Sequence, residues 1–191
     1  MTTTTQNRTT NPLPVRTRES AAEAAKPALL SAKNTLGFVP NLYGMLSNNP
    51  ETLNSYLLLS KALESSGLSA IEQQVVLLTV SIENGCEYCV AAHSAIAGMM
   101  KIPESVVLAL RNKQPLEDPK LEALRSFTAA VVQQRGLMNE DQLSRFLSVG
   151  YDGGTVLGVI TAVALKTISN YANHIAKTPL DDAFKPHSWA A

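Results

Sequence analysis

The chain has 191 residues, of which 45% are hydrophobic, and its 16 basic residues balance its 16 acidic residues. This length is most simply one domain with a substantial core. The balanced charge gives no basic stripe or acidic tail that would favour nucleic acid or a charged membrane. Two cysteines, three positions apart, cannot form the disulfide framework of a small secreted protein, so a reducing cytoplasm is expected.

The first 18 residues are polar, rich in Thr and free of acidic residues. They lack the apolar stretch of a secretory signal, so we expect residues 1–18 to form a disordered tail. The longest apolar stretch elsewhere, residues 155–165, is shorter than the roughly 20 residues that a membrane helix needs. A soluble protein without a membrane partner is therefore expected.

The rest of the chain predicts helices separated by turns. Asn49 before Pro50 marks one helix start, and Ser69 with Glu72 has the spacing of a capping box. Pro27 is expected to bend or split the first helix. No stretch indicates a strand, so the expected fold is all-α. Helices are predicted over residues 19–36, 41–47, 50–65, 71–82, 86–100, 103–111, 120–135, 140–149 and 152–176.

The last predicted helix, residues 152–176, is apolar on nearly all sides through Leu165. Such a helix belongs either in the core or in a subunit interface. No internal repeat of domain size is visible, so we expect a single helical domain over residues 19–182, followed by a C-terminal tail over residues 183–191.

Both cysteines and one of the three histidines lie close together in the middle of the chain. The dipeptide Asn84-Gly85 ends the helix before them, which places Cys86 in the opening turn of the next helix. Cys86, Cys89 and His93 then share one helix face, with Cys89 and His93 four residues apart. A helix N-terminus stabilises a thiolate, and such settings lower the pKa of cysteine from ~8.5 to between roughly 3.5 and 7.5. The pattern predicts a redox-active dithiol with an imidazole for proton transfer.

The sequence Glu-Asn-Gly-Cys-Glu-Tyr-Cys-Val-Ala-Ala-His at residues 83–93, with the apolar helix before it, resembles the carboxymuconolactone decarboxylase superfamily. Within that superfamily it is similar to the alkylhydroperoxidase D-like branch, whose signature is CxxCxxxH. Residues 37–42 and 167–181 resemble the flanks of peroxidase-related members, so the resemblance covers about residues 35–182. It implies an all-α bundle that oligomerises through its helices into trimers or hexamers.

The resemblance also implies a thiol peroxidase that needs no metal or organic cofactor. Cys89 would be the peroxidatic cysteine, which attacks a small hydroperoxide and becomes a sulfenic acid. Cys86 would resolve the sulfenic acid to a disulfide, and His93 would assist proton transfer. A dithiol reductant, either a lipoyl group or a thioredoxin-like protein, would regenerate the pair.

Two positions depart from the family pattern. The position of the relay glutamate, ahead of the first cysteine, holds Gln74, which cannot exchange a proton. Glu72 is already explained as a helix cap, so Glu83 is expected to substitute for the relay glutamate. The residue before the second cysteine, histidine in the best-known members, is Tyr88 here. These departures predict slow peroxidase activity or a different substrate.

Three other interpretations remain open from the sequence. A carboxymuconolactone decarboxylase-type lyase would act on a carboxylated lactone and would need no redox thiols. A zinc-stabilised helical scaffold would bind the metal through Cys86, Cys89 and His93, with His174 or His187 as the fourth ligand. Finally, the cysteines could be inert, because free cysteine is commonly buried.

Overall fold

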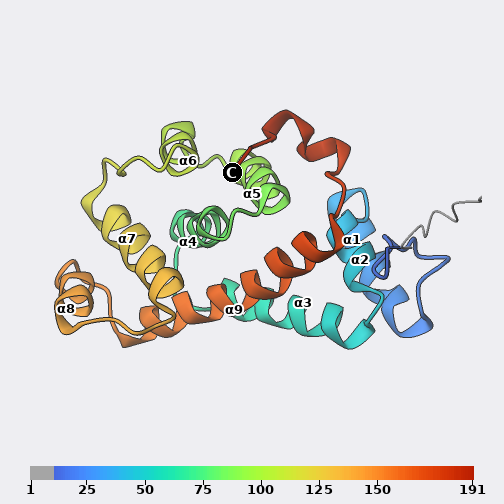
Figure 1. Cartoon of the computed structure of the whole chain (residues 1–191), viewed down its shortest axis with the longest axis horizontal. Helices are drawn as coiled ribbons and strands as arrows, with labels where there is room; N and C mark the ends of the chain where they lie inside the picture. The colour runs from blue at the N-terminus through green and yellow to red at the C-terminus, as the bar shows by residue number, and fades with distance from the viewer. Residues whose placement is uncertain (1–10) are drawn as a thin grey trace, which may run out of the picture.

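The computed structural model describes residues 11–191. Within these residues the chain folds into helices and contains no strand, which confirms the predicted all-α architecture (Figure 1). Short 3-10 helices, η1 (Glu23–Ala25) and η2 (Asp182–His187), precede α1 and follow α9. The α-helices are α1 (Lys26–Leu36), α2 (Asn41–Leu46), α3 (Pro50–Glu64), α4 (Ala70–Glu83), α5 (Glu87–Met99), α6 (Glu104–Arg111), α7 (Pro119–Gln134), α8 (Glu140–Ser148) and α9 (Gly153–Ala176).

The helix starts predicted at Asn49 and Ser69 are confirmed by their caps. The Asn49 side chain accepts hydrogen bonds from the backbone N–H groups of Glu51 and Thr52. At Ser69 the capping box is complete, since the Ser69 hydroxyl accepts from the Glu72 N–H and the Glu72 carboxylate accepts from the Ser69 N–H. These bonds satisfy N–H groups that have no partner inside a helix.

The stretch predicted as one helix is divided next to Pro27, as the sequence had suggested. Pro27 lies in the first turn of α1, and the residues before it form the separate helix η1. Proline lacks an N–H, and the first turn of a helix is where that N–H would have no partner anyway. The helix predicted over residues 19–36 is therefore shorter and begins next to the proline.

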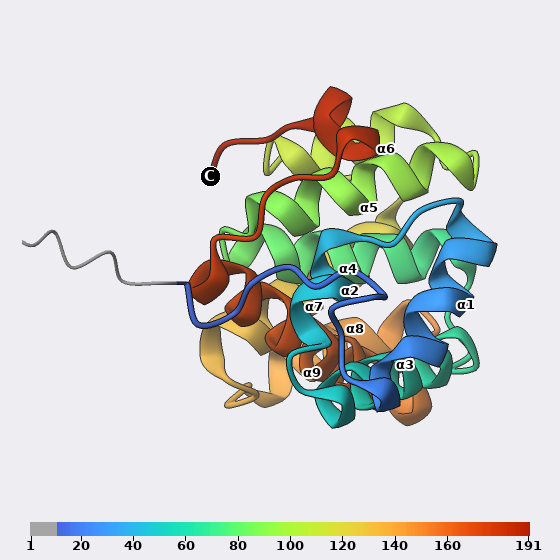
Figure 2. The ribbon, with the colours of Figure 1, turned by 90° about the vertical axis from the view of Figure 1, so that its right-hand side faces the viewer.

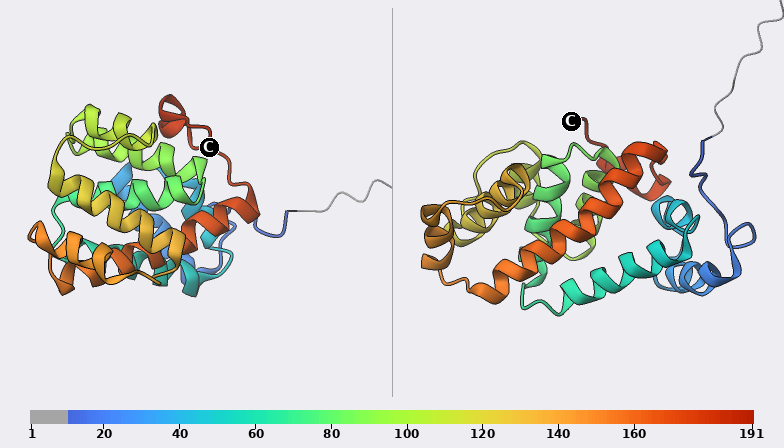
Figure 3. Two further views of the ribbon diagram at one scale, coloured as in Figure 1. Left: turned by 60° about the vertical axis from the view of Figure 1, so that its left-hand side comes forward. Right: turned by 60° about the horizontal axis from the view of Figure 1, so that its bottom comes forward.

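Helix α4 lies at the centre of the molecule, where α5, α6, α7 and α9 surround it (Figure 1). Residues 74–82 of α4 are all buried, as its apolar sequence predicts. Helix α3 packs along α9, and the two run side by side in Figure 3. The cysteine-bearing helix α5 is thus held between α4, α9 and η2.

Helix α9 combines the two environments that its apolar sequence allowed. One face packs against α3 and α4, whereas Leu157, Ile160, Tyr171 and Ile175 are exposed on the other. By length and composition alone α9 could cross a membrane, a property that it shares with buried core helices of soluble proteins. Its exposed apolar face is compatible with the expected homo-oligomer, which stays a prediction.

The first part of the predicted N-terminal tail, residues 1–10, lies outside the described residues. Residues 11–18, by contrast, pack against the domain. The Asn11 amide donates to the carbonyl oxygen of Ala176, and the Arg16 N–H donates to the carbonyl oxygen of Gly44. A Cβ on Gly44 would lie 2.5 Å from the Arg16 oxygen, so this close approach requires glycine. The packed part of the chain therefore begins before residue 19.

The predicted C-terminal tail, residues 183–191, also packs against the domain. Helix η2 lies on α5 (Figure 2), and Phe184 is buried against Phe38 and Tyr88. The Arg111 guanidinium donates to the carbonyl oxygens of His187 and Ser188. The short sequence of residues 183–191 has no helical or strand periodicity, so these contacts could not be predicted from it.

Candidate functional site

The two cysteines lie where α4 turns into α5. Gly85 adopts a left-handed conformation with φ 64°, which glycine accommodates without strain, and the chain then enters α5 with Cys86 as its N-cap. Cys89 follows in the first turn of α5. Both thiols are free and only 1% exposed. The prediction that Cys86 lies at the start of a helix is therefore confirmed. Both cysteines are buried rather than exposed on the surface.

Helix α9 supplies the polar groups that face the two sulfurs. The Asn173 amide nitrogen lies 3.3 Å from the Cys89 Sγ and 4.0 Å from the Cys86 Sγ. One amide thus reaches both sulfurs, and the pKa of each thiol is affected by the other.

Lys166 of α9 is fully buried beside this pair, with 1% of the residue exposed. Burial alone would raise the pKa of the Cys89 thiol, but the hydrogen bond from Cys86 and the positive charge of Lys166 outweigh it. Together with the amide of Asn173, they lower the pKa of Cys89 to about 5. Cys89 is therefore a thiolate at neutral pH, which is the nucleophilic form of cysteine.

Cys86 shows the opposite shift. Its hydrogen bond to Cys89, its burial and the negative charge of Cys89 raise the pKa of the Cys86 thiol far above its ordinary value. Cys86 consequently keeps its proton while Cys89 is ionised. The two thiols thus differ in ionisation, with Cys89 stabilised as a thiolate and Cys86 as a protonated thiol.

The imidazole of His93 contacts Gln74 rather than a carboxylate. Its Nδ1 lies 3.0 Å from the Gln74 Oε1. Because an amide oxygen can only accept a hydrogen bond, Nδ1 carries the proton and Nε2 has a free lone pair. Burial, with a further contribution from the charge of Lys166, lowers the pKa of His93 well below its ordinary range. His93 is therefore a neutral base at pH 7.

Glu83 does not reach the sulfurs. Its carboxylate accepts a hydrogen bond from the Gln133 amide on α7. The prediction that Glu83 replaces the relay glutamate is therefore not supported by the structure, and Gln74 occupies the relay position next to His93. Glu72 caps α4 and also accepts from the Tyr151 hydroxyl.

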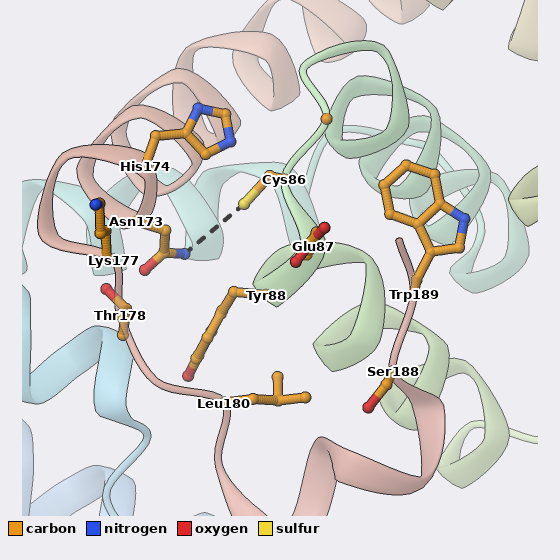
Figure 4. Close-up of a pocket in the computed structure, with 11 residues that line it drawn as sticks. Cys86, Glu87, Tyr88, Asn173, His174, Lys177, Thr178, Leu180, Ser188 and Trp189 are labelled. Atoms are coloured by element: carbon orange, nitrogen blue, oxygen red, sulfur yellow. Dashed lines mark hydrogen bonds between the residues drawn. The ribbon is translucent and has the colours of Figure 1, made fainter. Parts of the chain in front are cut away.

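Two cavities reach the pair, one at each sulfur. The Cys89 cavity, about 420 Å³, is bordered by Cys89, His93, Lys166, Tyr43, Tyr56 and Phe184. The Cys86 cavity, about 460 Å³, is bordered by Cys86, Tyr88, His174, Lys177, Leu180 and Trp189. Figure 4 shows Cys86 between Asn173 and His174 on one side and Trp189 on the other.

Tyr88 borders both cavities and is fixed in place. Its hydroxyl donates to the Asp181 carboxylate and accepts from the Leu42 N–H. Asp181 also accepts from the Asn41 N–H, which joins α2 to the segment that follows α9. Tyr88 is thus part of the wall between the two cavities and is not placed for acid catalysis.

The C-terminal segment, residues 183–189, covers both cavities. Ala183, Phe184 and His187 border the Cys89 cavity, and Ser188 and Trp189 border the Cys86 cavity. Arg111 holds this segment through its bonds to two carbonyl oxygens, and the Trp189 indole N–H donates back to the Arg111 carbonyl oxygen.

Arg111→Ala is expected to expose the sulfurs. Hydrogen bonds to charged groups contribute roughly 1.5–3 kcal/mol each, so losing even one of them should raise the open population by at least about tenfold. The rate at which iodoacetamide alkylates Cys89 measures this opening. Arg125→Ala is the matched control, because Arg125 pairs with Glu122 away from both cavities. An alkylation rate equal to that of the control would show that the segment does not limit access.

The described residues contain no group of three or more His, Cys, Asp or Glu side chains suited to a metal. His174 borders the Cys86 cavity and His187 the Cys89 cavity, so they lie in different cavities. The structure therefore does not assemble the ligand set that a zinc-stabilised scaffold would need.

Lys166, Asn170 and Asn173 were missed by sequence reasoning. Lys166 is the one residue among Asp, Glu, Lys and Arg within α9, and it follows a long apolar run. Lysine is almost never fully buried unless it is paired. A lone lysine in an apolar helix is thus the signal that could have identified it; the two asparagines lie one and two helical turns further along the same helix.

Comparison with known proteins supports the resemblance that the motif indicated. Residues 50–132, which include both cysteines and His93, match the model of the carboxymuconolactone decarboxylase family. A search of curated proteins found no match.

Similar solved structures have the same fold. An uncharacterized peroxidase-related protein from Ralstonia eutropha JMP134, described as an alkylhydroperoxidase AhpD core, has a TM-score of 0.79 and 23% identity over 92% of this chain and 96% of that chain. An uncharacterized peroxidase-related protein from Silicibacter sp. TM1040 has a TM-score of 0.78 and 19% identity over 96% and 97% of the two chains. These similarities confirm the expected alkylhydroperoxidase D-like helical fold.

The debrominase Bmp8 also shares this fold. Its apo structure has a TM-score of 0.78 and 17% identity over 93% of this chain and 96% of that chain. A cysteine-to-alanine variant of Bmp8, in complex with 2,3,4-tribromopyrrole, has a TM-score of 0.79 and 16% identity over 94% and 96%. The fold is therefore found in proteins described as peroxidase-related and in a debrominase.

Proposed function

We propose that this protein is a thiol-dependent peroxidase in which Cys89 is the peroxidatic cysteine and Cys86 the resolving cysteine. One observation carries the proposal. The Cys89 sulfur lies beside the buried Lys166 and the Asn173 amide, borders a cavity, and accepts a hydrogen bond from a second thiol. This arrangement provides an ionised nucleophile and a resolving thiol within reach of one another.

In the first step the Cys89 thiolate attacks the terminal oxygen of a hydroperoxide. An S–O bond forms, the O–O bond breaks, and an alkoxide leaves. The Cys86 thiol keeps its proton while Cys89 is ionised, and would supply that proton to the alkoxide. The amide nitrogen of Asn170, which is buried without a hydrogen-bond partner, is a further donor for developing negative charge.

In the second step the Cys86 thiolate attacks the sulfenic sulfur of Cys89. An S–S bond forms and hydroxide leaves, so the pair has given up two electrons to the peroxide. A dithiol reductant then returns the two electrons: Cys89 leaves the disulfide as a thiolate, and Cys86 regains its proton from the reductant. Neutral His93 borders the Cys89 cavity and is the base that would accept the proton of a Cys89 thiol that has picked one up from solvent. No metal or organic cofactor takes part in these steps.

The direct test is peroxide consumption coupled to a dithiol. Purified protein with cumene hydroperoxide and dihydrolipoamide should consume both in equal amounts at a saturable rate. Consumption no faster than in the absence of protein would contradict the proposal.

Gln74→Glu is expected to change the pH profile of the reaction. A carboxylate at this position would raise the pKa of His93, because it stabilises the imidazolium that Gln74 cannot. The imidazole could then exchange a proton with the site at neutral pH, and turnover should rise by about threefold to tenfold. Steady-state rates from pH 5 to 9 measure this effect, with Gln73→Glu as the neighbouring control. A profile identical to that of the wild type would exclude a role for the Gln74–His93 contact.

Reductive dehalogenation of an aromatic ring is a second candidate. The aromatic side chains around the Cys89 cavity, together with Lys166, suit a flat and electron-poor ring. The debrominase structures show that this fold accommodates a brominated pyrrole. Bromide release from 2,3,4-tribromopyrrole in the presence of a dithiol would support this candidate over the peroxidase.

The lyase activity that gives the family its name requires no redox thiols. Turnover of a carboxylated lactone by a Cys86→Ser, Cys89→Ser double variant would favour it. The free thiols favour a cytoplasmic location, and the exposed apolar face of α9 favours a homo-oligomer. A reducing cytoplasm would keep the pair reduced, and a trimer or hexamer would cover Leu157, Ile160 and Ile175.

A further inference from the structure

We propose that oxidant and reductant reach the cysteine pair by separate routes, with the substrate entering the Cys89 cavity and a slender dithiol entering the Cys86 cavity to attack the Cys86 sulfur. This inference rests on the proposed disulfide chemistry and adds to it the sulfur that is attacked and the cavity through which the reductant enters. The central observation is that each sulfur borders a different cavity.

The two cavities differ in their surroundings. The Cys89 cavity is enclosed mainly by aromatic and aliphatic side chains from α1, α2, α3 and α5. The Cys86 cavity lies at the C-terminal end of α9, where His174 and Lys177 are exposed at its rim and Leu180 and Trp189 border it. Tyr88, bonded to Asp181 and Leu42, is a fixed part of the wall between them. A molecule in one cavity therefore need not leave before another enters the second.

The two sulfurs also differ as leaving groups. Thiol–disulfide exchange is faster when the expelled sulfur is the one with the lower pKa. Attack on Cys86 expels Cys89, whose thiolate is stabilised by Lys166 and Asn173, whereas attack on Cys89 would expel the poorly ionised Cys86. Access and leaving-group stability thus favour the same sulfur.

In the first step of the exchange, a thiolate of the reductant attacks the Cys86 Sγ, the Cys86–Cys89 bond breaks, and the electron pair leaves on Cys89. The second thiol of the reductant then attacks the reductant's first sulfur, which is bound to Cys86 in the mixed disulfide. This step releases Cys86, which takes up the proton of that second thiol. The reductant is oxidised from dithiol to cyclic disulfide, and the protein pair is reduced by the same two electrons.

The depth of the sulfurs restricts the reductant. Cys86 is only 1% exposed and lies within a cavity of about 460 Å³. A thiol on the flat surface of a folded protein would not reach it. A dithiol on a narrow chain fits the cavity, and the positive charge of Lys177 at the rim attracts its thiolate form.

Selective narrowing of each cavity tests the proposal. The protein is first oxidised to the disulfide with diamide, so the test does not depend on peroxide activity. His174→Trp narrows the Cys86 cavity, and Leu137→Trp places the same side chain on an exposed position outside both cavities. Ser60→Trp narrows the Cys89 cavity. Reduction by dihydrolipoamide is followed by acid quenching, alkylation and intact mass.

His174→Trp should slow reduction by at least about tenfold, whereas Leu137→Trp and Ser60→Trp should stay within about twofold of the wild type. Ser60→Trp should instead slow oxidation by cumene hydroperoxide. Peptide mapping of wild-type protein, quenched early in its reaction with 2-mercaptoethanol, should place the mixed disulfide on Cys86. Unchanged reduction of the His174→Trp variant, or an adduct on Cys89, would overturn the proposal. Failure of diamide to form the disulfide would overturn the proposed function itself.

Discussion

Cys89→Ser will reduce dithiol-dependent peroxide consumption to the uncatalysed rate, a loss on the order of 10³-fold or more. A serine hydroxyl is not ionised at neutral pH, so the stabilisation that Lys166 and Asn173 give to a thiolate has nothing to act on. The serine is close to cysteine in size, and the buried site should remain folded. Steady-state consumption of cumene hydroperoxide measures the effect.

Cys86→Ser is the matched control for this prediction. It should still form one equivalent of sulfenic acid on Cys89, detected with a dimedone reagent, but it should lose multiple turnovers because no resolving thiol remains. Normal turnover by the Cys89→Ser variant would show that the nucleophile lies elsewhere.

Lys166→Met will move the reactivity of Cys89 to higher pH. Burial raises the pKa of Cys89, and the charge of Lys166 lowers it. Without that charge, the pKa of Cys89 should rise by roughly one to three units. The wild-type thiol, with a pKa of about 5, is almost fully ionised at pH 7. In the variant a larger share of the thiol is protonated at pH 6, so alkylation and peroxide reaction at that pH should slow by about twofold for a rise of one unit and by about tenfold for a rise of two units.

The midpoint of iodoacetamide alkylation of Cys89 against pH measures this shift, with peptide mapping to separate Cys89 from Cys86. Methionine fills a space similar to that of the lysine stem, and replacing a buried charge with an apolar side chain is often neutral for stability. Lys166→Arg keeps the charge and is the control. An unchanged midpoint in the methionine variant would mean that Lys166 does not set the ionisation of Cys89.

Much of the fold could be predicted because its helix boundaries are encoded locally. Asn49 and Ser69 mark the starts of their helices, because their side chains accept hydrogen bonds from nearby N–H groups. Gly85 marks the turn before α5. The segments outside these helices were harder to predict. Asn11 contacts Ala176 and Phe184 contacts Tyr88, both far away in the sequence, and no local sequence pattern predicts such contacts.

The candidate site could be predicted only as far as one helix extends. Helical spacing brought Cys86, Cys89 and His93 together, because all three belong to the same turns of α5. The residues that set the ionisation of the thiols come from α9, and the partner of His93 comes from α4. Glu83 was predicted to replace the relay glutamate because it lies close to the cysteines in the sequence. At the end of α4, however, its carboxylate accepts a hydrogen bond from Gln133 of α7.

The most direct measurement is the intact mass of the reduced protein after one equivalent of hydroperoxide and alkylation of the remaining thiols. If Cys89 and Cys86 form a peroxide-driven redox pair, the mass will show a loss of two hydrogens and no alkylated cysteine. Fragmentation will locate the bond between Cys86 and Cys89. Protein that still carries two alkylated cysteines after the peroxide treatment would contradict the account.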